Sequence, residues 1–212
     1  LVVRATNEYG EFDKVALTLY NLEMVVEPFR ETVLTVVGSA APTENSAETS
    51  FQWLLVEADA NGDPLVGSEP VLDMLMGPQT SVTLTKPGTV YDLVVKEYSQ
   101  DGTLAAAGRF KVACKYVRRE IRKLKDHDRE AFFDAMEIFY TVPTDVGKQL
   151  YGSNFFNYER VTAYHDSKIT DYCYHDGMQF LTSHASFTLV AERYLQMINP
   201  RVSIPIWDFM ID

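Results

Sequence analysis

The spacing of apolar residues changes partway along this chain. Up to about residue 112, short runs rich in β-branched and aromatic residues predict strands. These runs lie at 33–37, 51–56, 81–85 and 91–95. Turn signals separate them: Asn61-Gly62-Asp63-Pro64, Gly77-Pro78, Lys86-Pro87-Gly88 and Asp101-Gly102. Strands at this spacing predict a β-sandwich of the immunoglobulin or fibronectin type III kind over residues 23–112, with Trp53 in its core.

The first residues alternate between apolar and polar on both sides of Asn7-Glu8-Tyr9-Gly10, which predicts a hairpin. We expect residues 1–22 to be the end of a preceding sandwich module. On this interpretation the chain is a fragment of a longer multidomain protein.

From Cys114 onwards the apolar period is helical, so the fold class is expected to be a β-sandwich followed by a helical domain over 113–212. Ile121 and Leu124, and then a cluster of apolar residues over 132–140, predict a pair of helices. Asp126 is expected to cap the helix that carries His127. A further helix is expected from about 155 to 166, with Tyr158, Val161 and His165 on one face.

The last predicted helix has a clear apolar stripe. Its members follow one another in steps of mostly three and four residues: Phe180, His184, Phe187, Thr188, Ala191, Tyr194, Leu195 and Ile198. His175 and His184 are nine residues apart, which is roughly 900° on one continuous helix, so they would point to opposite faces. Gly177 offers a break between them. We therefore expect His175 in a loop and His184 one turn into a helix, on its buried face.

Charge and composition narrow the function classes. The net charge of −11 argues against nucleic acid as a partner. It is uneven, because residues 1–112 carry 7 basic and 16 acidic side chains and residues 113–212 carry 12 and 14. This shift falls where the period changes, which supports a domain boundary near 112. The sequence contains no run of 18 apolar residues, so it does not predict a transmembrane helix. The N-terminus does not reveal the localisation, although sandwich modules are compatible with a secreted protein.

Three of the four histidines lie in the last fifty residues: His165, His175 and His184. Neutral imidazole is the commonest metal ligand and suits copper, zinc and iron. Because no run of carboxylates accompanies them, a nitrogen-liganded transition metal is favoured over calcium or magnesium. The alternative for any single histidine is a hydrogen-bonded core residue. His127, among charged residues at a helix start, is expected to be solvated.

The same segment resembles a known family. The residues that carry the resemblance are Cys173-x-His175, the nine-residue step to His184 with Phe180-Leu181 between, Glu192, and Asn199-Pro200 followed by Pro205-x-Trp207-Asp208. In this order they resemble the first copper half-domain of the tyrosinase, catechol oxidase and molluscan haemocyanin superfamily. The stretch from Cys114 to Met136 is similar to the helical lead-in of such domains. The implied fold of residues 113–212 is the N-terminal half of a tyrosinase-like helical bundle.

The resemblance implies a role for each matched residue. His165, His175 and His184 would be the three ligands of one copper ion. Cys173 would match the cysteine that in some members forms a thioether to the ring of the second histidine; a free thiol and a disulfide with Cys114 are the alternatives. Phe180 would pack over the copper, Glu192 would lie in the surroundings of the site, and Trp207 and Asp208 would fix the turn after the last helix.

The implied function is that of a type-3 copper oxidoreductase, which oxidises phenols and o-diphenols to o-quinones with O2. The second copper site of the family would come from the rest of the same polypeptide, so this chain alone is expected to be inactive. Two alternatives stay open. One is a haemocyanin-like O2 carrier. The other is a structural or adhesive multidomain protein with a degenerate copper site, because Ser183 and Ala185 replace the aromatic residue and the arginine usual beside the third ligand.

Overall fold

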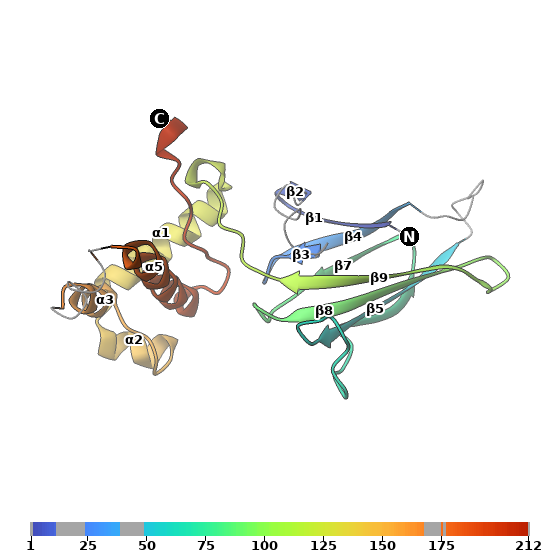
Figure 1. Cartoon of the computed structure of the whole chain (residues 1–212), viewed down its shortest axis with the longest axis horizontal. Helices are drawn as coiled ribbons and strands as arrows, with labels where there is room; N and C mark the ends of the chain where they lie inside the picture. Colours follow the sequence, from blue (N-terminus) through green and yellow to red (C-terminus); the bar gives the residue numbers. More distant parts are fainter. Residues whose placement is uncertain (1, 12–23, 39–48, 168–174, 176, 212) are drawn as a thin grey trace. The chain divides into compact units, whose positions relative to one another are not determined.

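The computed structural model describes residues 2–11, 24–38, 49–167, 175 and 177–211. The chain forms two compact units, Leu1–Tyr116 and Val117–Asp212 (Figure 1). The first is built from β-strands and the second from helices, so the protein is of mixed β plus α class. Among the described helices, none combines the length and the apolar character that crossing a lipid bilayer requires.

The β unit contains two sheets. One has the strand order β2 (Gly10–Glu11), β1 (Val2–Asn7), β4 (Glu31–Gly38), β7 (Gln79–Thr83). The other has the order β3 (Met24–Val26), β9 (Leu104–Cys114), β8 (Val90–Tyr98), β5 (Ser50–Ala58), β6 (Leu72–Met76). All described pairs are antiparallel except β3 with β9, which is parallel.

One apolar core receives side chains from both sheets. Alternate residues of β5 are buried, and Trp53 at its centre is fully buried with its Nε1 donating to Gly77 O at 3.1 Å. Leu93 of β8 and Leu34 of β4 pack into the same cluster. The predicted strands at 33–37, 51–56 and 91–95 fall within β4, β5 and β8. The strand predicted at 81–85 corresponds to β7, which lies two residues earlier, because the residues that pair with β4 are Gln79 to Thr83.

The expectation that residues 1–22 end a preceding module does not fit the structure. The predicted hairpin exists as β1 and β2, but β1 pairs antiparallel with β4 in register Ala5↔Leu34. Ala5 is buried in the core that contains Trp53. β1 pairs with the backbone hydrogen-bonding groups along one edge of β4, and it covers part of this core. Residues 2–11 therefore belong to this sheet.

Cys114 ends β9 as a free, fully buried thiol. Burial raises its pKa from 9.0 to about 11. A proton is therefore held more tightly in the folded state than in the unfolded one. The stabilisation that results is complete below pH 9 and is lost as the pH rises towards 11.

We therefore expect the free energy of unfolding of the β unit to fall by about 2 kcal/mol between pH 8 and pH 11 because of Cys114 alone. Urea unfolding followed by Trp53 fluorescence, in a Trp207→Phe background, measures it. The Cys114→Ala variant should lack this part of the loss. An identical pH dependence with and without the thiol would contradict the assignment. Burial and the nearby Cys114 charge raise the pKa of Tyr91, to about 12. The burial contribution should remain in both proteins, whereas the contribution of Cys114 is lost with the thiol.

The helical unit begins with a short 3-10 turn, η2 (Ile121–Lys123), where the sequence predicted a helix. Four α-helices follow among the described residues: α1 (Asp126–Thr141), α2 (Thr144–Tyr151), α3 (Tyr158–His165) and α5 (Gln179–Ile198). A last 3-10 turn, η3, spans Phe209–Ile211. The expected helix at 155–166 is shorter than predicted, since Asn157 occupies its N-cap position.

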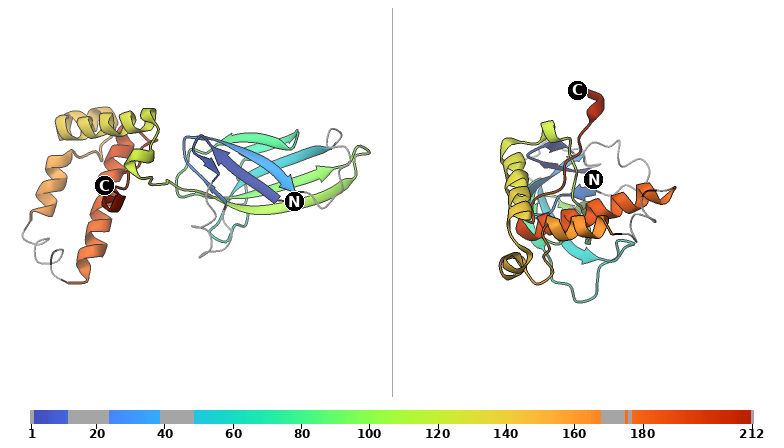
Figure 2. Two further views of the ribbon diagram at one scale, coloured as in Figure 1. Left: turned by 90° about the horizontal axis from the view of Figure 1, so that it is seen from above. Right: turned by 90° about the vertical axis from the view of Figure 1, so that its left-hand side faces the viewer.

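The core of this unit lies where α1, α3 and α5 meet. Phe132, Ala135 and Phe139 of α1 are buried against Val161 of α3 and Leu195 of α5. Figure 2 shows the last turn of α3 and the first turns of α5 on the same side of the unit. One capping prediction was wrong: Lys125 is the N-cap of α1, without a side-chain cap bond, and Asp126 is the first helical residue. Its charge still suits the positive end of the helix.

Gly147 lets α2 approach the ring of Phe155, which is fully buried. A Cβ at this position would lie 2.2 Å from Cε1 of Phe155, so the ring or the helix must move. We expect Gly147→Ala to destabilise the helical unit by about 2 kcal/mol. Gln149→Ala, at an exposed position of the same helix, is the control and should change the stability by less than about 0.5 kcal/mol. Thermal unfolding followed by the helical circular dichroism signal compares the two; equal midpoints would refute the clash.

Candidate metal centre

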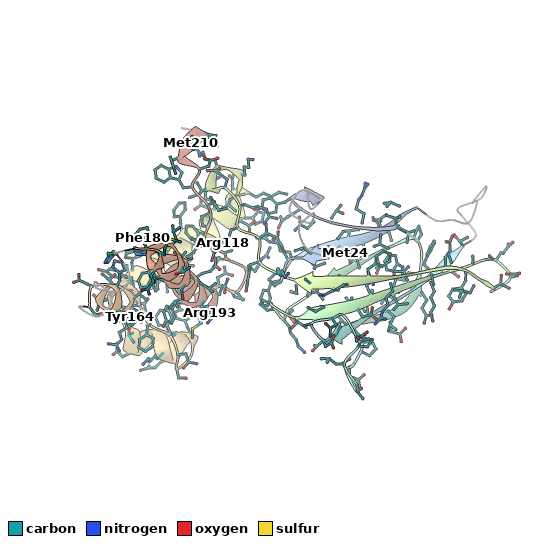
Figure 3. The ribbon with its side chains drawn as sticks, in the orientation of Figure 1. Met24, Arg118, Tyr164, Phe180, Arg193 and Met210 are labelled. Atoms are coloured by element: carbon teal, nitrogen blue, oxygen red, sulfur yellow. The ribbon has the colours of Figure 1, made fainter. Side chains whose placement is uncertain are left out.

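Three imidazole rings gather at one end of the helical unit. His165 is the last residue of α3, His184 lies in the second turn of α5, and His175 comes from the segment between these helices. One ring nitrogen of each lies within 4.8 Å of those of the other two. In Figure 3, Tyr164 on α3 and Phe180 on α5 mark this end of the unit. The structure thus brings together all three histidines that the sequence singled out.

The rings face one another at angles that suit a shared ion. Their centroids are 5.1 to 5.4 Å apart and no two rings are parallel. Nε2 of His165 lies 3.4 Å from Nε2 of His184. Two nitrogens that each lie about 2.0 Å from one ion in a tetrahedral arrangement are separated by about 3.3 Å. The residues present therefore fit a transition-metal ion of the kind that imidazole binds.

A backbone contact fixes the tautomer of His184. Its Nδ1 lies 2.8 Å from the carbonyl oxygen of Phe180, one turn earlier in α5. A carbonyl oxygen only accepts, so Nδ1 carries the hydrogen and Nε2 of the neutral ring presents its lone pair. That lone pair is on the side of the ring where His165 lies.

The predicted break between His175 and His184 is present. Gly177 has φ +92°, a conformation that favours glycine, and α5 begins two residues later at Gln179. A Cβ at Gly177 would meet nothing within 4 Å, so the backbone angle alone calls for glycine. His175 is exposed, whereas His165 and His184 are half-buried.

Two phenylalanines contact the imidazoles. The ring of Phe180 lies 4.3 Å from that of His184, and the ring of Phe187 lies 5.2 Å from that of His165. Phe180 is 44% exposed, although the stripe predicted a buried position, because it belongs to the first turn of α5. Sequence reasoning assigned Phe187 only to the stripe. Its position three residues after His184 was the available signal that it shares the face of this ligand candidate.

Glu192 is buried two turns along α5 from His184, and its carboxylate binds elsewhere. Arg118 donates Nε to Oε2 and a second nitrogen to Oε1, both at 2.9 Å. The backbone N of Ile204 donates to Oε2 at 2.8 Å. Through Glu192, α5 is therefore bound both to the chain before η2, at Arg118, and to the chain after α5, at Ile204.

The remaining candidates lie away from the described imidazole contacts. Trp207 is 65% exposed and contacts the ring of Phe209. Asp208 accepts from Met210 N with its side chain and from Arg122 with its carbonyl oxygen. His127 is in the first turn of α1 and 54% of its side chain is exposed. Cys173 lies outside the described residues.

Two comparisons with known proteins bear on this site. No curated protein matches the chain. Residues 156–212 match the family model described as the common central domain of tyrosinase. The matched segment contains His165, His175 and His184, and copper binding is general in that family. This match supports membership of the segment in the tyrosinase superfamily of type-3 copper proteins.

Proposed function

We propose that residues 117–212 form the first copper half of a type-3 copper oxidoreductase that oxidises phenols or o-diphenols to o-quinones with O2. The observation that carries the proposal is the convergence of His165, His175 and His184, with two Nε2 atoms 3.4 Å apart, inside the segment that matches the tyrosinase family model. Copper bound by these imidazoles would supply the electron transfer that couples O2 to the oxidation of the phenol.

The contribution of this chain is to hold and orient the ligands. The Phe180 carbonyl accepts from Nδ1 of His184, which places the lone pair of the neutral ring on Nε2. The rings of Phe180 and Phe187 limit rotation of the neighbouring imidazoles. Cys173 is proposed to restrain His175 further through a thioether. Such restraint matters most for His175, which lies in neither α3 nor α5.

The second copper site is proposed to come from further residues of the same polypeptide, and the partners to be O2 and a phenolic small molecule. With one copper site, this chain alone should not turn over substrate. An O2 carrier and a degenerate structural module remain outcomes of the experiments below.

The β unit is proposed to be of the immunoglobulin or fibronectin type III kind. The order β9-β8-β5-β6 corresponds to strands G, F, C and C′ of such sandwiches, and β1-β4-β7 corresponds to A, B and E. Trp53 on β5 then occupies the place of the buried tryptophan of strand C.

Copper content is the direct test. The 212-residue chain, loaded with copper and freed of excess by gel filtration, should retain about one copper per chain by elemental analysis. A copper-free chain would refute the proposed site.

Activity is a separate test. A polypeptide extended past Asp212 should contain two coppers and form o-quinone from a catechol with consumption of O2, measured side by side by absorbance and an oxygen electrode. Reversible O2 uptake without quinone would identify a carrier. One copper or none in the extended protein would favour the degenerate module.

A further inference from the structure

A pocket of about 220 Å³ lies among α1, α3 and α5, next to the imidazole cluster but separate from its nitrogens. Five aromatic rings line it, from Phe132, Phe139, Tyr140, Tyr158 and Phe187. Phe187 is shared, because its ring also contacts His165. None of the described residues that line the pocket carries a charge.

We propose that this pocket binds a small, neutral, single-ring aromatic molecule. Size is the first argument: an apolar protein cavity of about 150 Å³ is known to take up benzene, and this pocket is larger. It holds one ring with modest substituents and has no room for an extended ligand.

The chemistry of the walls selects the ligand. Phe132, Phe139, Val161 and Leu195 are buried and form an apolar floor, so an ionised group there would lose its hydration without gaining a partner. Several ring faces and edges favour an aromatic guest, which gains from stacked or edge-on contacts beyond its apolar area.

The pocket is accessible from solvent. Tyr140 is 51% exposed and Thr162 is also exposed, so these two lining residues mark its mouth. Tyr140 stacks on Tyr158 with ring centroids 4.4 Å apart, which gives one side of the mouth a defined aromatic wall. The hydroxyl groups of these residues allow a single polar substituent on the guest to remain hydrogen-bonded.

The test uses the metal-free 212-residue chain, so it does not depend on the proposed copper site. Toluene is titrated as the neutral probe and benzoate as its charged analogue, with methyl NMR signals of Val161 and Leu195 reporting on the pocket. We expect saturable toluene binding with a Kd of about 1 mM or tighter, and benzoate at least about tenfold weaker.

Two substitutions fill the pocket from different elements: Ala191→Leu on α5 and Ile204→Phe on the segment after it. Each should weaken toluene binding at least about tenfold, whereas Ala163→Leu, at an exposed site on α3, should not. If one of these two filled variants does not fold, toluene binding by the other one tests the proposal. Absence of saturation, equal affinity for benzoate, or binding unchanged in a folded filled variant would overturn the proposal.

Discussion

Replacing His184 by glutamine should abolish stoichiometric copper binding by this chain. The tautomer of His184 is fixed through Nδ1 and the Phe180 carbonyl. This histidine also lies in a regular helix, so its Nε2 is held where His165 presents its own. Glutamine keeps the length of the side chain but offers a neutral amide, which is a poor ligand for copper.

The expected loss is at least about 100-fold in copper affinity, because even residues that only support a metal ligand cost 10- to 100-fold when they are replaced. Copper per chain after gel filtration should fall from about one to a small fraction. The matched control is His127→Gln, which removes a histidine from the same unit at a position outside the cluster. Equal retention by the two variants, or equal loss, would exclude His184 as a specific ligand.

The position of the candidate site could be predicted because its signals are local. The nine-residue spacing, the glycine break and the apolar stripe together require a loop histidine and a helical one. In the structure, Gly177 has positive φ and α5 begins just after it. The side of α3 on which His165 lies could also be predicted, because His165 follows the buried Val161 by four residues and so shares its helix face.

Contacts between segments distant in sequence could not be predicted. Periodicity identifies a buried face but not what covers it, so the packing of Phe187 on His165 and the binding of Glu192 by Arg118 were not foreseen. The same limit applies to β1, whose alternation indicates a strand but not that its partner is β4.

Short or exposed elements were also missed. β6 contains Asp73 among apolar residues and β9 begins Leu104-Ala-Ala-Ala-Gly, which has low strand propensity. Pairing with β5 and β8 respectively makes these segments strands. In each case tertiary hydrogen bonds override a weak local preference.

The ion pair of Arg118 and Glu192 should be the strongest single polar contribution to the stability of the helical unit. Glu192 is 4% exposed and accepts three hydrogen bonds, two from Arg118 and one from Ile204 N. The bidentate contact also raises the pKa of Arg118. Removal of the guanidinium would leave a buried carboxylate with one backbone donor, which is far more costly than the loss of an exposed pair.

We expect Arg118→Met to lower the free energy of unfolding of the helical unit by about 3 kcal/mol, the lower end for a broken buried pair, because 37% of the Arg118 side chain is exposed and water can partly replace it. Arg193→Met, at an exposed position of α5, should cost less than about 0.5 kcal/mol. Urea unfolding followed by the helical circular dichroism signal measures both.

A double variant separates the buried charge from lost packing. Arg118→Met combined with Glu192→Gln removes the charge but keeps an acceptor for Ile204 N, so it should recover most of the stability lost in Arg118→Met. If the double variant is instead less stable than the single one, the side-chain packing of Arg118 is the larger contribution. Equal stability of Arg118→Met and Arg193→Met would show that the guanidinium of Arg118 adds nothing measurable to the stability of the helical unit.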